Sequence, residues 1–390
     1  MGKSKNRFNK QLKKIDVSLI RQFDEEVSSI KDMIKLTLGE PDFHTPDHVK
    51  AAGIEAIVQN FTHYTGMSGL IEVREAVSQF FVKKYGITYK PESEIIVTIG
   101  ATEAISASLL AILEEGDKVL LPAPVYPGYE PLITLAKAET IYLDTSKDNF
   151  LVTPQMIDEA MREYGEEIKA IILNYPNNPT GATYTREEIK AIADTVGKYP
   201  VFVISDEIYS ELTYDGTHAS IAKYLPEQTI VINGLSKSHA MTGWRLGFIL
   251  ANEKITKEIV KVHQYLVTAA STISQKAAIR ALVEGMNDPD EMRLEYKKRR
   301  DFVYEKMTKR GFHIARPNGA FYIFGKIPSG YIQDSMQFCV DLAKKEKLAI
   351  IPGIAFGIEG EGYVRISYAA SMEILQEAMK RLGSYMEKCK

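Results

Sequence analysis

Residues 234–247 have the sequence GLSKSHAMTGWRLG and follow the apolar run IVIN at 230–233. A lysine directly after a buried strand is unusual, because lysines in folded proteins are mostly exposed. Lys237 shares this short segment with three glycines, the only tryptophan of the chain and Arg245. An amine with a lowered pKa can attack a carbonyl and form an imine, and an arginine can bind a phosphate through two hydrogen bonds. The segment therefore predicts a chemical site rather than a surface lysine.

The sequence around this segment alternates between short apolar runs and longer runs with helical spacing. Helices are expected at 102–113 and 186–195, among others. This alternation predicts an α/β fold with a mainly parallel sheet that helices cover on both faces, and it assigns residues 45–285 to one large domain. The expected strands are 95–99, 119–122, 140–143, 170–173, 201–205, 230–233 and 247–250.

The last hundred residues follow a different pattern. A long charged helix is expected at 292–310 and is followed by the apolar runs AFYIF, LAIIPG and YVRISYA, with helices near 336–346 and from Met372 onward. This order predicts a smaller α+β domain formed by residues 286–390. The N-terminal segment 1–44 is expected to pack with it.

Composition and charge limit the class of protein. The chain has 390 residues, is 45% hydrophobic and 25% charged, and carries a formal net charge of −3, so nothing favours nucleic-acid or membrane binding. The basic N-terminus MGKSKNRFNKQLKK continues into a polar stretch instead of the apolar run of a secretory signal. The cysteines Cys339 and Cys389 form no motif, which argues for a reduced, cytoplasmic setting and against disulfides or a metal site.

Two further strand ends carry polar residues that suit ligand binding. The sequence GATEA at 100–104 follows IIVTI, and a helix beginning there offers free N–H groups and the Thr102 hydroxyl to a phosphate. The loop YPNNPTG at 175–181 contains two prolines and a glycine, which would hold Asn178 in a fixed direction. An ordinary helix cap and an ordinary turn are the alternatives for these two segments.

Two charged residues occur where apolar strands are expected. Asp206 follows VFVIS, and a buried acid is costly without a cation such as a protonated pyridine nitrogen. Arg365 lies within YVRISY at 363–368, where a carboxylate ligand would be a suitable partner. A helix-capping aspartate and an internal salt bridge are the alternatives.

Together and in this order, these segments resemble the class I/II aminotransferases, the aspartate-aminotransferase-like branch of fold type I pyridoxal-phosphate (PLP) enzymes. The pattern SK-x5-GWR-x-G with upstream NPTG and D-E-x-Y carries the resemblance, which extends from LTLGEPDF at 36–43 to YVRISYA at 363–369. The resemblance implies a three-layer α/β/α large domain with a mainly parallel seven-stranded sheet, plus a smaller α+β domain.

The resemblance also implies a role for each residue around the pyridoxal ring. Lys237 would form the Schiff base with PLP and carry the proton between the substrate's α-carbon and the cofactor's C4′. Asp206 would pair with the pyridinium nitrogen and keep it protonated. Tyr209 and Asn178 would hydrogen-bond the phenolic oxygen of the ring. Tyr126, in PVYPGY, would stack on the ring face.

The phosphate would be held by a separate set of residues. Ala101, Thr102, Ser236 and Arg245 match the phosphate-binding positions of the family. One departure is Gly234, because many relatives have a serine ligand three residues before the lysine. Ser236 is therefore a weaker expectation than Arg245.

Two further roles extend beyond the cofactor. Tyr64, in HYTGMSGL, resembles the tyrosine that reaches the phosphate of the neighbouring subunit, which would require a homodimer. Arg365, with Asn178 and the Gly39 backbone, would bind the α-carboxylate of the substrate. The smaller domain is expected to close over bound substrate and exclude water.

The expected reaction is transfer of an amino group from an L-amino acid to a 2-oxo acid such as 2-oxoglutarate. No second arginine can be assigned to an aspartate side chain, and Phe23, Tyr64, Tyr126 and Phe356 suit a bulky substrate, so aromatic amino acids come first; ordinary packing would explain the same four residues. An N-acetyl-L,L-diaminopimelate aminotransferase of lysine biosynthesis is the first alternative.

Two other functions use a related scaffold, because fold alone does not determine the reaction. A PLP-dependent C–S β-lyase would release ammonia and pyruvate without an acceptor. A ligand-binding regulator would need a DNA-binding helix-turn-helix region, and the segment before Leu36 has no basic recognition-helix pattern.

Overall fold

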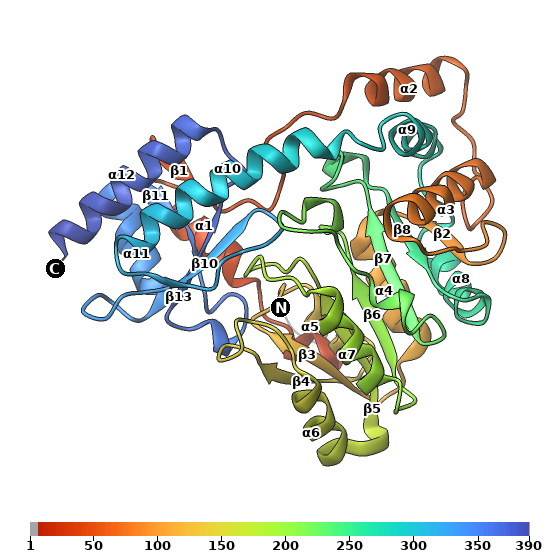
Figure 1. Cartoon of the computed structure of the whole chain (residues 1–390), viewed down its shortest axis with the longest axis horizontal. Helices are drawn as coiled ribbons and strands as arrows, with labels where there is room; N and C mark the ends of the chain where they lie inside the picture. The colour runs from red at the N-terminus through yellow and green to blue at the C-terminus, as the bar shows by residue number, and fades with distance from the viewer. Residues whose placement is uncertain (1–6, 390) are drawn as a thin grey trace.

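The computed structural model describes residues 7–389, and a seven-stranded sheet forms its centre (Figure 1). The strand order is β2-β8-β7-β6-β5-β3-β4. Strand β8 is antiparallel to both of its neighbours, and the pairs from β7 to β4 are parallel. The strands are β2 (Ile95–Thr98), β3 (Lys118–Ala123), β4 (Glu139–Asp144), β5 (Ile168–Asn174), β6 (Phe202–Asp206), β7 (Thr229–Gly234) and β8 (Gly247–Leu250).

Helices cover both faces of this sheet, as the near-continuous apolar strands predict. Alternate residues of one strand enter different cores: Ile230 and Ile232 pack beneath α4, α5 and α8, whereas Val231 packs beneath α3 and α9. The seven-stranded, mainly parallel, three-layer prediction is therefore confirmed. The helices are α2 (Asp47–Val58), α3 (Ile71–Tyr85), α4 (Gly100–Ile112), α5 (Tyr129–Leu135), α6 (Pro154–Tyr164), α7 (Arg186–Val196), α8 (Glu253–Val267) and α9 (Thr272–Val283).

Two element boundaries differ from the sequence prediction in ways that matter for the site. Strand β6 continues through Asp206, which the sequence placed just beyond the strand. Helix α4 begins at Gly100 rather than Thr102, because Gly100 adopts φ +76 and lets the chain turn directly from strand into helix.

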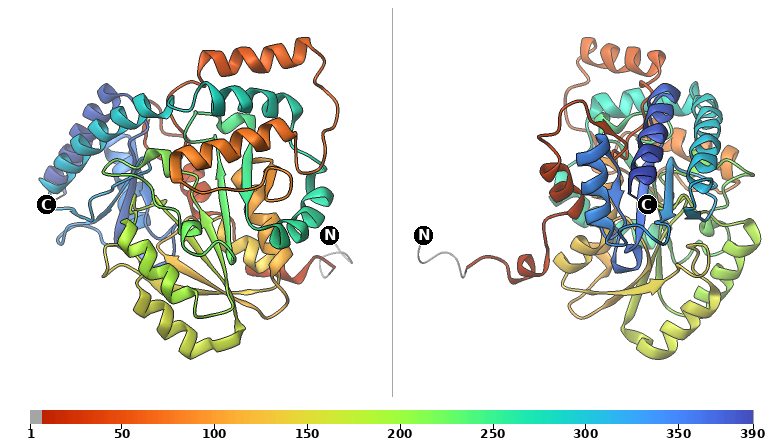
Figure 2. Two further views of the ribbon diagram at one scale, coloured as in Figure 1. Left: turned by 45° about the vertical axis from the view of Figure 1, so that its right-hand side comes forward. Right: turned by 90° about the vertical axis from the view of Figure 1, so that its left-hand side faces the viewer.

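A four-stranded antiparallel sheet organises the C-terminal part, with the order β12-β13-β10-β9. Helix α10 (Pro289–Thr308) extends toward it from the region of α9, and the C-terminal elements lie together beside the large sheet (Figures 1 and 2). The strands are β9 (His313–Ile314), β10 (Tyr322–Lys326), β12 (Ile351–Pro352) and β13 (Tyr363–Ser367), and the remaining helices are α11 (Ser335–Glu346) and α12 (Met372–Lys388).

The N-terminal segment contributes to this second part of the fold. Strand β1 (Ile34–Lys35) pairs in parallel with β11 (Leu348–Ala349), and helix α1 (Leu19–Glu26) buries Phe23 in the same apolar core. The division into residues 45–285 against 1–44 and 286–390 stays a prediction, and residues 1–6 and 390 lie outside the described part. Within residues 7–389, no helix is both long and apolar enough to cross a membrane.

Candidate active site

A cavity of about 380 Å³ lies at the carboxyl ends of the parallel strands, where ligands bind in open α/β sheets. It brings together residues that are far apart in the sequence and that come from both parts of the fold. Of the predicted site residues, Tyr64 alone does not line it. The others in the lining are Gly39, Ala101, Thr102, Tyr126, Asn178, Asp206, Tyr209, Ser236, Lys237, Arg245 and Arg365.

Lys237 is held in this cavity just beyond the end of β7. Its Nζ donates a hydrogen bond of 2.5 Å to the backbone oxygen of Gly39. Burial lowers the pKa of the Lys237 amine to about 8, and the positive charge of Arg245 acts in the same direction. A substantial fraction of this amine is therefore uncharged just above neutral pH, as a nucleophile or proton acceptor must be.

Asp206 is the last residue of β6, and its side chain is buried. Tyr129 donates a hydrogen bond of 2.6 Å to Oδ2, and the backbone N–H of Ile208 donates one of 3.2 Å to Oδ1. Burial raises the pKa of Asp206 to about 6, while these two hydrogen bonds oppose the rise. A cation beside the carboxylate would lower its pKa again, so the site suits a protonated ring nitrogen.

Arg365 is buried without a carboxylate partner. Its Nη1 donates a hydrogen bond of 3.0 Å to Oδ1 of Asn178, and its Nη2 donates to the backbone oxygen of Thr37. Its guanidinium lies between the rings of Tyr322 and Phe356, 4.7 and 4.9 Å from their centroids. Its Nε has no hydrogen-bond partner among the described residues.

The alternative interpretation of Arg365, an internal salt bridge, is therefore not seen within residues 7–389, where no acid lies within ion-pairing distance of it. A buried, uncompensated guanidinium is costly unless a ligand completes it. The geometry points to a carboxylate as that ligand, since a carboxylate matches the two-pronged guanidinium.

Another part of the cavity lining suits an anion. The N-terminus of α4 faces Arg245, and a Cβ added at Gly100 would lie 2.8 Å from Nη2 of that arginine. A Cβ at Gly247 would lie 2.6 Å from the carbonyl carbon of Gly100, so strand β8 touches this turn directly. Free helix N–H groups, a guanidinium and the hydroxyls of Thr102 and Ser236 suit a phosphate group.

Comparison with known proteins agrees with this geometry. Residues 31–382 match the family described as aminotransferase class I and II. The chain is 48% identical over 380 residues to a probable N-acetyl-LL-diaminopimelate aminotransferase of Bacillus subtilis, covering 97% of this chain and 96% of that protein. This chain belongs to the class I and II aminotransferases.

Relatives of this aminotransferase differ in their named substrates. An aspartate aminotransferase of Pyrococcus horikoshii is 40% identical, with 95% of each chain covered. The solved structure of an aromatic aminotransferase from the same organism superposes with a TM-score of 0.87 at 39% identity, covering 94% of this chain and 99% of that one. The family shows that this aminotransferase is a PLP-dependent enzyme of fold type I, and leaves its amino acid substrate open.

The residues of this aminotransferase fit its cofactor. Asp206, the Lys237 amine and a set of anion-binding groups line one cavity. These anion-binding groups, called the anion cradle, are the N-terminus of α4, Thr102, Ser236 and Arg245. PLP needs these three features together, because its ring carries a pyridine nitrogen, an aldehyde and a phosphate. Two tyrosines that the sequence did not single out complete the ring region. Tyr129 hydrogen-bonds Asp206, and the hydroxyl of Tyr322 lies 2.8 Å from that of Tyr209.

Two polar links in this aminotransferase also escaped sequence reasoning. Asn174 accepts a hydrogen bond from the Asn178 backbone and donates one to the Asp206 backbone, and so joins the NPTG loop to β6. His263 bonds both Glu103 in the first turn of α4 and the backbone of Met67, and so ties α4 to the loop that carries Tyr64. Asparagine at the end of AIILN was a visible signal for the first link, whereas nothing local indicated the second.

The four aromatic residues that would suit a bulky substrate lie in different places. Tyr126 lines the cavity, as predicted. Phe23 does not, because it lies on the core-facing side of α1 and is fully buried, and Phe356 lies behind Arg365. Tyr64 is 88% exposed and is not among the residues that line the cavity.

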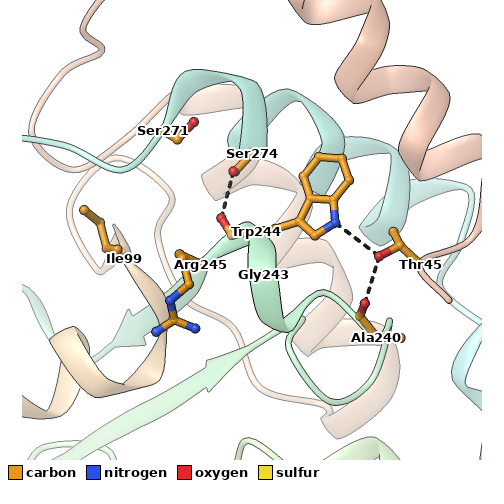
Figure 3. A pocket seen from close by; sticks show the side chains of 8 residues that line it. All are labelled: Thr45, Ile99, Ala240, Gly243, Trp244, Arg245, Ser271 and Ser274. Atoms are coloured by element: carbon orange, nitrogen blue, oxygen red, sulfur yellow. Dashed lines mark hydrogen bonds between the residues drawn. The ribbon is translucent and has the colours of Figure 1, made fainter. Parts of the chain in front are cut away.

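A second hollow, of about 700 Å³ and open to solvent, lies beside the anion cradle (Figure 3). Its wall is held by hydrogen bonds from Trp244 Nε1 to Thr45 Oγ1, from Thr45 Oγ1 to the Ala240 oxygen, and from Ser274 Oγ to the Trp244 oxygen. Arg245 is exposed and lines both this hollow and the main cavity, so the hollow borders the anion cradle.

Proposed function

We propose that this aminotransferase transfers the amino group of an aromatic L-amino acid to a 2-oxo acid such as 2-oxoglutarate. The apolar part of the cavity lining carries the proposal: it includes Ile20, Leu38, Tyr126 and Tyr322. Leu38 is 64% exposed despite being apolar, and a bulky apolar substrate side chain would cover it.

The positive charges of the lining support the same conclusion. Among the described residues, Lys237, Arg245 and Arg365 are the cations that line the cavity. Each has a function in the proposal, as the amine, the phosphate ligand and the α-carboxylate ligand. None is left to bind a carboxylate on the substrate side chain, so aspartate fits less well than phenylalanine.

The proposed role of Lys237 follows from its lowered pKa and its place at the centre of the cavity. Bound PLP supplies an electron sink for the pair released when the α-C–H bond of the substrate breaks. Lys237 would hold the cofactor through its amine until the amino group of the substrate displaces it, and the freed amine would then take the proton from the α-carbon and return it to the adjoining cofactor carbon. Its position within a confined site favours this transfer.

The remaining roles divide between the ring and the substrate. Asp206 would hold the proton on the ring nitrogen, while Tyr209 and the Nδ2 group of Asn178 would donate to the ring oxygen. Arg365 would bind the α-carboxylate together with the backbone N–H of Gly39. A Cβ at Gly39 would lie 2.5 Å from the Tyr322 hydroxyl, so this backbone approaches the site as only glycine can.

The phosphate would bind to the N–H groups of Ala101 and Thr102, the Ser236 hydroxyl and the Arg245 guanidinium. We further propose a homodimer in which Tyr64 of one chain completes the phosphate site of the other. The exposure of Tyr64 and the open hollow beside Arg245 support this arrangement (Figure 3). A dimer in which Tyr64→Phe leaves cofactor affinity unchanged would contradict it.

The proposal also includes the division into residues 45–285 against 1–44 and 286–390, and a cytoplasmic location.

Helix α1 and residues 37–39 line the cavity together with β13, so movement of the C-terminal part would close the mouth of the cavity. Closure would exclude water during proton transfer. Crystals grown with and without 3-phenylpropionate test this, since identical positions of α1 would count against closure.

N-acetyl-L,L-diaminopimelate is the second candidate substrate, and one observation favours it. The relative that carries this name is 48% identical to this chain, against 39% for the solved aromatic aminotransferase. The acetylated substrate also presents a long side chain, whose three methylene groups could pack on the apolar lining. Its distal carboxylate, however, has no free cation in the described lining of the cavity.

The test uses the cofactor-loaded enzyme and single amino acids without an acceptor. The absorbance of the bound cofactor is recorded with phenylalanine, tyrosine, aspartate, alanine and N-acetyl-L,L-diaminopimelate, with Lys237→Ala as the control. Fastest conversion by phenylalanine or tyrosine supports the proposal. Fastest conversion by the acetylated diamino acid replaces it with the second candidate. Ammonia and pyruvate released from cystathionine without any acceptor would instead favour the β-lyase.

A further inference from the structure

Helix α1 forms a part of the cavity wall that has no role in the proposed binding of the cofactor or of the substrate's α-carboxylate. Ile20 and Asp24 are one turn apart and both line the cavity. Phe23 and Val27, also one turn apart, are fully buried in the neighbouring apolar core. Because these two anchors fix the rotation of the helix, Asp24 is directed into the cavity by packing.

Within residues 7–389, the Asp24 carboxylate has no direct polar partner. Its Oδ1 atom is buried there without a hydrogen bond, and no described cation lies within ion-pairing distance of it. An unpartnered buried oxygen costs stability, so its presence in a binding cavity points to a ligand. Its charge reaches Arg365, where it partly offsets the lowering of the arginine pKa by burial.

We propose that Asp24 selects the substrate side chain by repelling a second carboxylate and by accepting a hydrogen bond from a donor such as the hydroxyl of tyrosine. The inference rests on the proposed function, which places the α-carboxylate on Arg365 and the α-carbon beside Lys237. The side chain of the substrate then lies against Ile20, Leu38 and Asp24. A negative charge in this region disfavours aspartate, glutamate and 2-oxoglutarate relative to aromatic partners, so 2-oxoglutarate would serve as an acceptor but a slower one than an aromatic 2-oxo acid.

The test compares Asp24→Asn with Glu25→Gln. The control removes the same charge from an exposed position one residue away on α1. Single-turnover rates are measured with glutamate, leucine, phenylalanine and tyrosine. In Asp24→Asn, the ratio of glutamate to phenylalanine reactivity should rise about tenfold, as expected for removal of one like charge at intermediate dielectric. The single-turnover rate with tyrosine should fall by about threefold to tenfold relative to the rate with phenylalanine.

A binding measurement separates this inference from catalysis. Succinate and 3-phenylpropionate both carry a carboxylate for Arg365, and only succinate carries a second one. Calorimetry on the holoenzyme should show that Asp24→Asn raises the affinity for succinate about tenfold relative to the affinity for 3-phenylpropionate. Glu25→Gln should leave both affinities unchanged.

Several outcomes would overturn the inference. An equal change for all ligands leaves their ratios unaltered and would mean that Asp24 acts only through Arg365, and no change for any ligand would mean that Asp24 has no influence on binding. The proposed function can fail separately: wild type that reacts with leucine and glutamate but not with phenylalanine would refute the aromatic assignment. The succinate comparison would still decide the role of Asp24.

Discussion

The hydroxyl of Tyr129 donates a hydrogen bond of 2.6 Å to Oδ2 of Asp206, and both side chains are buried. This bond opposes the rise that burial causes in the pKa of Asp206. It therefore stabilises the charged carboxylate that the ring nitrogen of PLP needs as its partner.

Replacing Tyr129 by phenylalanine should make the Asp206 carboxylate a weaker partner for the ring nitrogen. The pKa of Asp206 should rise, and transamination should slow by about tenfold or more, since hydrogen bonds to charged groups are worth roughly 1.5–3 kcal/mol. The pH dependence of the single-turnover rate measures both effects. Tyr199→Phe removes a similar bond to Asp158 at the surface and should leave the profile unchanged. An unshifted acidic limb in Tyr129→Phe would show that Asp206 does not depend on this contact.

The pKa of Lys237 makes cofactor capture depend on pH. The protonated amine cannot attack the aldehyde, so the rate at which apoenzyme forms its imine with PLP should rise with pH through about 8 and then level off. The same shift has a consequence for stability. Because the folded pKa lies below the unfolded value, the unfolded chain binds more protons between about 8 and 10.5, and the apoenzyme should gain stability as pH rises across that window. Stopped-flow absorbance tests the first statement, and a rate that falls through pH 8 would contradict it.

Gly100 should be essential for the anion cradle. Alanine there must adopt φ +76 and places its Cβ 2.8 Å from Arg245 Nη2, so the arginine must move. Affinity for PLP should fall by about tenfold or more, and the free energy of unfolding by about 1–3 kcal/mol. The matched control is Gly116→Ala, where φ is +95 and no atom lies within 4 Å of the new Cβ. It reproduces the backbone strain without the clash, so equal losses of PLP affinity in the two variants would refute the cradle.

Arg365 should govern substrate binding without affecting the cofactor. Lysine in its place keeps the charge and loses the two-pronged geometry, so kcat/KM should fall by about tenfold to hundredfold while PLP affinity stays the same. Arg300→Lys alters an equally buried guanidinium away from the cavity and should change stability without raising KM. Steady-state kinetics and a PLP titration on both variants provide the comparison. A loss of PLP affinity in Arg365→Lys would place the arginine at the cofactor instead.

Much of the large domain could be predicted because its strands are long and apolar on both faces. The expected strand 247–250 coincides with β8, and the other six differ by one or two residues at their ends. Strands β1, β9, β11 and β12 were not expected as separate elements, because each contains two residues and two residues carry no periodic pattern. For Phe23 the structure selects ordinary packing over substrate contact, the alternative that the sequence had left open, because sequence does not show which side of α1 meets the core.

Site residues next to strand ends were predictable, because parallel strands bring their carboxyl ends to one edge. The missed ones act through partners that are distant in sequence. Tyr129 lies 77 residues from Asp206, and Tyr322 lies 113 residues from Tyr209. His263 reaches Glu103 across 160 residues, and Asp24 becomes notable only when its buried oxygen is seen without a partner.

The most direct test of the account is to locate the cofactor on the chain. The holoenzyme is reduced with borohydride, which turns an imine into a stable amine, and is then digested for mass spectrometry. We predict that the mass of the reduced cofactor appears on the peptide containing Lys237 and disappears in Lys237→Ala. A cofactor mass on any other lysine of the wild-type protein, or none at all, would contradict the assignment on which the site depends.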